Sequence, residues 1–278
     1  MTRFYDTPTG QLDQFKRNLA DVGHMTAEEV AAVNGRPELA LVMLGALRDA
    51  IPLKNRFDRY RDLRISPIDW IAQLRDYNRL YWDNRFTEED FAQAEAQLLA
   101  AIPIGHVQSV NNLFGFHVAF SSLEETFEMW YKVYQGELPG ACRWPELKVD
   151  AEHLGLHESA RSYEPGIHLV NIDLVAHWEP GDGRTLIQVR EQAKSNGEIL
   201  AQLEVISIYG VLTELFMQQD GENLPYSDMS GTDVKVPGDS GPCALCVDWD
   251  RHDRKAEFGA DWVDDRNQSW AAPVLREL

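Results

Sequence analysis

Apolar side chains recur at intervals of three and four residues through the first hundred positions, which is the spacing of amphipathic helices. Ser66 and Pro67 form a cap and a first turn ahead of one such series. Thr87 precedes the acidic first turn of another series. Together with further apolar series before residue 60, these patterns predict an N-terminal helical bundle over residues 1–102.

After residue 102 the spacing changes to the alternation that is typical of strands. Residues 106–120 are rich in Val, Phe and Asn, and they predict one or two strands with Gly115 at a bend or bulge. A helix is expected to follow from a cap at Ser121 or Ser122. Residues 166–178 alternate most regularly and predict a long strand.

Helical spacing returns near residue 185 and again in residues 195–219. The second segment is apolar on nearly every side and opens with the capping pair Ser195 and Glu198, so we expect one central, buried helix. The tail from Cys243 predicts a small antiparallel β meander with strands in CALCVDWD, AEFGADWVDD and SWAAPVLRE. Strands, helices and again strands favour an α+β fold over a doubly wound parallel sheet.

The composition is that of an ordinary folded protein, with 44% aliphatic, aromatic and Cys residues and 26% charged residues among 278. The net charge of −19 is uneven along the chain. Residues 1–100 carry 13 basic and 16 acidic side chains, whereas residues 101–278 carry 13 basic and 29 acidic ones. We therefore predict a helical region over 1–102 and an acidic, mixed α+β region over 103–278, with one compact domain as the alternative.

Charge and composition also limit the partners and the location. Nucleic-acid binding needs clustered Lys and Arg, so no direct nucleic-acid partner is expected for such an acidic chain. No run of eighteen apolar residues occurs, and no apolar segment stands near the start, so neither a membrane partner nor a secretory signal is expected. Three cysteines cannot build a disulfide framework, which favours a cytoplasmic location.

The stretch GDSGPCALC, residues 238–246, resembles two catalytic motifs. A serine-protease role for Ser240 would need a His and an Asp delivered by two β-barrels, and the nearest upstream histidine is only 63 residues away on a predicted strand. A redox CxxC pair normally starts a helix, whereas the residues after Cys246 predict a strand. We interpret the stretch as a turn that leads into a strand, with Cys243 and Cys246 in the core.

Four of the eight histidines fall within 25 residues and have acidic neighbours. On a helix, His153 and His157 would share one face, and Asp173 or His177 on the neighbouring strand would complete a ligand set for Zn²⁺ or Mn²⁺. Such an ion activates water for hydrolysis. Gly155 interrupts this helix and no HExxH pattern is present, so separate structural histidines without a cofactor remain the first expectation.

An arginine-rich stretch at residues 48–64 carries six basic and three acidic side chains. Arg56, Arg59 and Arg64 could bind an anion as bidentate donors. The interspersed acidic residues favour a salt-bridged helix face instead.

Eight tryptophans are present, and Trp249, Trp262 and Trp270 fall one on each predicted strand of the tail. They would stack across the strands and, if exposed, form a patch that binds another protein. No complete catalytic constellation is present, so we expect a non-catalytic protein–protein interaction or assembly component, with homo-oligomerisation left open. A metal-dependent hydrolase is the first alternative. An acidic mimic that inhibits a basic, nucleic-acid-binding partner is the second.

Overall fold

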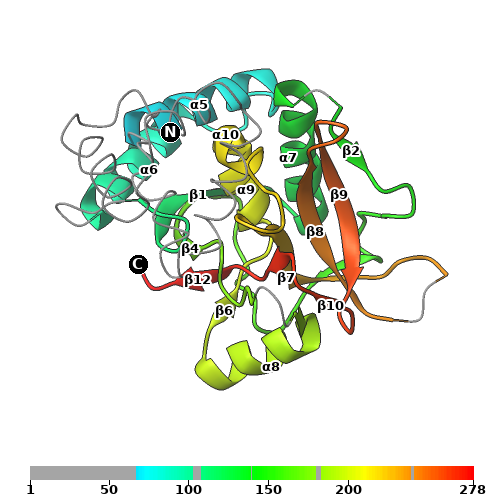
Figure 1. The fold of residues 1–278 in the computed structure, drawn as a ribbon. Coiled ribbons are helices and arrows are strands. Elements are labelled where there is room, and N and C mark those ends of the chain that lie inside the picture. The colour runs from blue at the N-terminus through cyan, green and yellow to red at the C-terminus, as the bar shows by residue number, and fades with distance from the viewer. Residues whose placement is uncertain (1–66, 103–107, 139, 180–182, 239–240) are drawn as a thin grey trace, which may run out of the picture. The chain divides into compact units, whose positions relative to one another are not determined.

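The fold is that of a computed structural model, which describes residues 67–102, 108–138, 140–179, 183–238 and 241–278. Figure 1 shows helices and strands mixed along these ranges, so the predicted α+β class is confirmed. The helices are α5 (Pro67–Leu80), α6 (Glu88–Ala101), α7 (Leu123–Glu137), α8 (Leu186–Asn196), α9 (Glu204–Val211) and α10 (Thr213–Phe216).

Twelve strands are formed by the described residues. They are β1 (Leu113–Ala119), β2 (Cys142–Arg143), β3 (Leu154–Leu156), β4 (Gly166–Asp173), β5 (Arg184–Thr185), β6 (Ile199–Leu200), β7 (Tyr226–Val234), β8 (Cys243–Asp250), β9 (Lys255–Trp262), β10 (Arg266–Asn267), β11 (Trp270–Ala271) and β12 (Val274–Arg276). The strands β5 and β10 pair only with each other. The others form a four-stranded and a six-stranded sheet.

Helix starts follow the predicted capping residues. The Thr87 hydroxyl accepts a hydrogen bond from the Asp90 amide, and the Asp90 carboxylate accepts one from the Thr87 amide. Ser122 caps α7 in the same way, by accepting from the Glu125 amide at 3.2 Å. These starts are confirmed, and α5 begins at the expected proline, Pro67.

The four-stranded sheet has the order β1-β4-β12-β6. Gly115 lies in the middle of β1, opposite Val170 in a regular antiparallel register, so the predicted bend or bulge is wrong. The glycine is required for close packing instead, because a Cβ atom at this position would lie 2.5 Å from Ile208 and from Trp70. The adjacent strand β4 ends at Asp173, earlier than the strand predicted over residues 166–178.

The six-stranded sheet has the order β11-β7-β8-β9-β2, with β3 also paired to β7. The predicted hairpin of β8 and β9 is confirmed, whereas the third tail segment does not extend it as a meander. Its first part, β11, pairs in parallel with β7, and its last part, β12, crosses to the other sheet and pairs with β4 and β6. Pro273 separates the two parts and lacks the amide that a continuous strand would need.

Residues 200–212 of the segment 195–219 are buried as expected, but the segment is not one helix. Ser195 lies inside α8, β6 follows, and only then does α9 begin. All eight residues of α9 are buried. The hydroxyl groups of Tyr77 and Tyr134 donate to the α9 carbonyls of Gly210 and Ile206 at 2.9 Å and 3.0 Å. Figure 1 shows α9 and α10 between the two sheets, so this short helix joins the core of both.

The helices predicted before residue 67 lie outside the described residues. Within the described ranges, no helix is both long and hydrophobic enough to cross a bilayer.

Candidate binding groove

The residues predicted as metal ligands each have a separate partner. His153 Nδ1 lies 2.6 Å from Asp150 Oδ1, and His177 Nε2 lies 2.9 Å from Glu198 Oε2. Arg276 Nη2 donates to Asp173 Oδ2 at 2.7 Å, and the Ser159 amide donates to His157 Nδ1 at 3.2 Å. No group of three or more His, Cys, Asp or Glu side chains is arranged to hold a metal ion in the part of the chain that the structure describes.

The local fold explains why these residues do not meet. The predicted pairing of His153 with His157 requires a helix, but β3 occupies Leu154–Leu156 and pairs with β7. The two histidines therefore stand before and after an extended strand, and not on adjacent helical turns. His177 lies beyond the end of β4, in a turn where its φ is 56°. The ligand set on which the metal-dependent hydrolase rested is not brought together.

Other predicted site residues have mixed outcomes. Arg56, Arg59, Arg64 and Ser240 lie outside the described residues. Cys243 and Cys246 are buried on β8, and residues three apart on a strand point to opposite faces. Their interpretation as core cysteines is confirmed.

The predicted tryptophan ladder is wrong. Trp249 is only 7% exposed and packs against Phe216 of α10. Trp262 stands at the other end of the β8–β9 hairpin, and Trp270 stacks on Tyr226 near β7. Each of the three tail segments contains one tryptophan, but the third segment does not pair with the β8–β9 hairpin. The three rings therefore do not lie on neighbouring strands. Of these three tryptophans, Trp262 lines a cavity in the described part of the chain.

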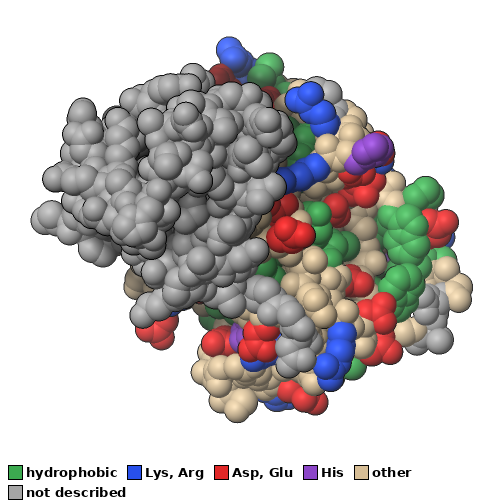
Figure 2. All heavy atoms as spheres, viewed as in Figure 1, with side chains coloured by type: hydrophobic (Ala, Val, Ile, Leu, Met, Phe, Trp, Pro, Cys, Tyr) green, Lys and Arg blue, Asp and Glu red, His purple; other side chains and the backbone are tan. Residues whose placement is uncertain are grey.

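That cavity encloses about 530 Å³ at the edge of the six-stranded sheet, and we call it the edge groove. Figure 2 shows hydrophobic side chains gathered beside β9, where Figure 1 draws the loop that follows β2, with acidic side chains next to them. The edge groove is lined by Cys142, Arg143, Trp144, Pro145, Asp248, Lys255, Glu257, Phe258, Gly259, Ala260 and Trp262.

Two half-buried tryptophans form the aromatic wall of the edge groove. Trp144 directly follows β2, and Trp262 ends β9. Their ring centroids are 6.2 Å apart at an interplanar angle of 68°, which is an edge-to-face contact. Each ring thus keeps part of its surface accessible. Large aromatic surfaces with a polar edge are favourable contact points for a partner.

The opposite wall carries carboxylates. Asp248 on β8 is directly opposite Glu257 on β9. Burial, followed by the negative charges of Glu257 and Asp250, raises the pKa of Asp248 to about 7. The Asp248 side chain has no hydrogen bond or ion pair with any described residue. A cation placed in the edge groove would lower this pKa and gain a counter-ion.

The nearby cations are already engaged. Lys255 binds Glu257 at 2.7 Å and Asp253 at 3.1 Å. Arg143 turns toward α7, where it binds Glu128 at 2.6 Å and stacks on Tyr131 at 5.3 Å. Neither cation therefore neutralises Asp248 directly.

Strand alternation extends the acidic character across the sheet. Asp228 of β7, Asp248 of β8 and Asp261 of β9 occupy one face, and the face also carries Cys246. Asp228 is only 4% exposed, and burial followed by the charge of Asp261 holds its pKa well above the usual range. The face thus concentrates three carboxyl groups, those of Asp228, Asp248 and Asp261, whose pKa values are raised by burial.

A second polar cluster lies under a larger cavity, of about 940 Å³, that includes the side chain of Tyr163. Behind Tyr163, the Nδ1 atom of His117 is 2.9 Å from the Ser207 hydroxyl oxygen. Ser207 also donates to the Leu203 carbonyl at 3.2 Å. Burial lowers the pKa of His117 to about 3, so the ring is neutral.

This His–Ser pair is arranged for structure and not for nucleophilic attack. Since the single hydroxyl hydrogen of Ser207 goes to Leu203, His117 must donate through Nδ1, and it cannot act as a base toward that oxygen through the same nitrogen. The side chains of His117 and Ser207 are 1% and 0% exposed, and neither lines the cavity. A substrate would have no access to them.

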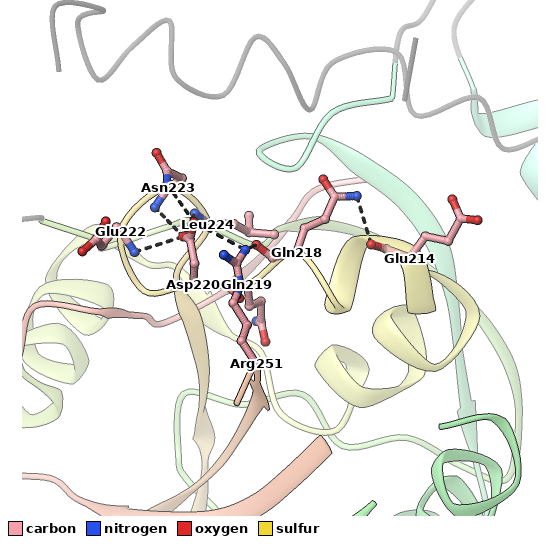
Figure 3. A network of polar contacts seen from close by, with 8 residues as sticks. All are labelled: Glu214, Gln218, Gln219, Asp220, Glu222, Asn223, Leu224 and Arg251. Carbon is pink, nitrogen blue, oxygen red and sulfur yellow. Dashed lines mark hydrogen bonds and ion pairs between the residues drawn. The ribbon is translucent and has the colours of Figure 1, made fainter. Parts of the chain in front are cut away.

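A third polar network closes the loop between α10 and β7. Figure 3 shows Asp220 surrounded by the backbone of its own turn, with Arg251 reaching it from the β8–β9 turn. Asp220 Oδ1 accepts from the amides of Asn223 and Leu224 at 2.6 Å and 3.0 Å. Arg251 donates to the Gln219 carbonyl at 2.8 Å. These hydrogen bonds hold the turn at Asp220 together and tie Arg251 to it, so we interpret the network as structural.

In comparisons with known proteins, no protein family, no curated protein and no solved structure matches this chain. The geometry of the edge groove is therefore the basis of the functional argument. Sequence analysis identified Trp262 but missed Trp144 and Asp248. The alternation in CALCVDWD did place Asp248 on a polar face, yet only the pairing with β9 and β2 shows which side chains lie next to it.

Proposed function

We propose that this protein is a binding component that holds a positively charged segment of another protein in the edge groove. The observation that carries the proposal is Asp248, a half-buried carboxylate whose side chain has no partner among the described residues, in a groove that two half-buried tryptophans also line. A Lys or Arg side chain would give Asp248 a counter-ion, and an adjacent apolar side chain of the same segment would lie against Trp144 or Trp262. The net charge of −19 adds a long-range attraction for the same partner.

The composition of the edge groove supports binding over catalysis. Among its described lining residues there is no His to act as a base beside the carboxylates, and no Ser or Thr to act as a nucleophile. The one thiol, Cys142, has its pKa raised by burial and by the charge of Glu257, so it remains protonated and unreactive.

The test uses the full chain and a fluorescein-labelled decapeptide of alternating Arg and Val, with an otherwise identical Glu and Val peptide. Fluorescence anisotropy measures both dissociation constants at about pH 8, where Asp248 is ionised. We expect the Arg peptide to bind at least about tenfold more tightly than the Glu peptide. Equal binding of the two peptides would refute the proposal.

Matched variants localise the binding. We expect Trp144→Ala and Asp248→Asn each to weaken binding of the Arg peptide by about tenfold, through lost ring contact and lost charge. Trp270→Ala removes a tryptophan from another part of the sheet, and Glu191→Gln removes an exposed carboxylate from α8. Both controls should change the dissociation constant less than about twofold. Loss of binding in the controls as large as in the groove variants would contradict the assignment.

The acidic mimic differs from this proposal in what it predicts. Mimicry through overall charge gives binding that falls steeply with salt and is insensitive to either tryptophan. The edge groove instead gives binding that retains a tryptophan-dependent part at high salt. Anisotropy titrations of Trp144→Ala across a salt series separate the two.

A further inference from the structure

The strand β9 is only partly covered by its neighbour β2. The two strands pair in parallel at just two positions, Glu257 and Phe258. Directly after them, the Trp144 amide donates to the Phe258 carbonyl at 2.9 Å. The Trp144 carbonyl then accepts from the Leu147 amide at 3.0 Å, so a turn carries the chain away from β9.

This turn leaves the edge of β9 open at Ala260. Main-chain groups alternate along a strand, so the N–H and C=O groups of Ala260 point to the same side as the Phe258 carbonyl. The Val263 amide donates to Pro242 on the opposite side, which agrees with this alternation. In a continued ladder the Ala260 amide would donate to the Trp144 carbonyl, but Leu147 takes that acceptor. No described residue bonds to the main chain of Ala260 on this side.

The edge groove surrounds this open position on both faces of the strand. Phe258, Ala260 and Trp262 lie on one face of β9, and Glu257 and Gly259 lie on the other. The aromatic wall therefore lies on one face of β9, and the carboxylates lie on the other face. An extended chain beside Ala260 would direct successive side chains alternately to the two walls.

We propose that the partner segment binds as an additional strand beside Ala260, with an apolar side chain against Trp144 and Trp262 and the next, basic side chain toward Asp248 and Glu257. This inference rests on the proposed function and adds the conformation and the sequence pattern of the ligand. Open strand edges are templates for such pairing, in which main-chain bonds supply affinity and alternate side-chain pockets supply specificity.

Single N-methylation of the peptide backbone tests the proposal. In the alternating Arg and Val peptide, one set of amides faces β9 and the other set faces solvent, because the two sets alternate along a strand. Two series of peptides carry one N-methyl group each, in one series on Val and in the other on Arg. We expect central N-methyl groups in one series to weaken binding by about tenfold, and those in the other to leave it within about twofold.

The paired series is its own control, since each N-methyl group restricts the peptide in a similar way. Equal effects in both series would overturn strand addition, while tight binding of the unmodified Arg peptide would still support the proposed function. Failure of that unmodified peptide to bind better than the Glu peptide would instead refute the proposed function itself.

Amide hydrogen exchange supplies an independent measurement on the protein. Binding of the unmodified peptide should slow exchange of the Ala260 amide at least about fivefold, because the amide becomes hydrogen-bonded. The amides of Leu245 and Val247, which lie between β7 and β9, should not change. Unchanged exchange at Ala260 in the complex would overturn strand addition.

Discussion

Glu204 and Asp248 have the same raised pKa, about 7, in two very different surroundings. Glu204 starts α9 and is 0% exposed, with Oε2 accepting from the Gln202 amide at 2.6 Å. Asp248 lies half-buried on the outer face of the six-stranded sheet, in the wall of the edge groove. Desolvation is the largest cause in both cases. A raised pKa therefore identifies a buried carboxyl group, and access decides whether a ligand can use it.

The same contrast separates the two regions as a whole. Around α9, the polar side chains of His117, Ser207 and Glu204 are enclosed by the core, so they influence stability. Around β9, the side chains of Trp144 and Asp248 remain accessible, so they can influence binding. If so, substitutions around α9 should change the stability of the protein, and substitutions around β9 should change its binding of a partner.

The largest expected effect is on stability. His117→Ala should lower the free energy of unfolding by about 3 kcal/mol, because it leaves a cavity and removes the partner of the buried Ser207 hydroxyl. Urea denaturation followed by circular dichroism measures this. The control, His252→Ala in the exposed β8–β9 turn, should change it by less than about 0.5 kcal/mol. A loss below about 1 kcal/mol for His117→Ala would show that the cluster is not a structural unit.

The next effect is the pH dependence that Glu204 imposes on stability. The folded pKa of Glu204 is about 7, above the ordinary glutamate value of 4.5, so the folded state binds more protons between these values and stability falls as pH rises through that window. Glu204→Gln removes this fall. From about pH 5 to about pH 8, the variant should gain about 2–3 kcal/mol relative to the wild type.

The relative measurement matters because His117 acts in the opposite direction. Its pKa is lowered to about 3, so its contribution to stability rises as pH approaches the ordinary histidine value. His117 is present in both proteins, so its effect cancels in the difference. A difference that does not change with pH would mean that Glu204 is not protonated in the folded state at about pH 5.

The smallest effect is the pH dependence of peptide binding. A cationic ligand favours the ionised form of Asp248, so affinity for the Arg peptide should rise by about fivefold between about pH 6 and about pH 8. Anisotropy titrations should show a flat profile for Asp248→Asn and an unchanged rise for Glu204→Gln. A rise in affinity for Asp248→Asn together with a flat profile for Glu204→Gln would contradict the division of binding and stability between the two regions.

Local patterns predicted the elements whose cause is local. The starts of α6 and α7 follow from Thr87 and Ser122, because a cap acts on amides two or three residues away. The β8–β9 hairpin follows from two alternating segments joined by a short charged turn. The burial of residues 204–211 follows from their lack of a polar side.

Predictions that needed knowledge of distant neighbours were wrong or incomplete. The region 195–219 looked like one helix because a strand of two residues, β6, is too short to interrupt an apolar pattern, and β12 pairs with it from the other end of the chain. Gly115 looked like a bulge, but its role is set by Trp70 and Ile208 on two other elements. The histidines were close in sequence and were directed to separate partners.

The sequence by itself determined the α+β class, the net negative charge, the main helix starts and the central buried segment, because composition and short-range periodicity govern these properties. The tertiary structure alone decided that Trp144 meets Trp262, that Asp248 lines the same groove without a side-chain partner among the described residues, and that the edge of β9 remains open at Ala260. Each of these features depends on pairing between separate strands, namely the pairing of β2 with β9 and of β9 with β8. Such pairing is fixed by the packing of the whole sheet and not by any one segment.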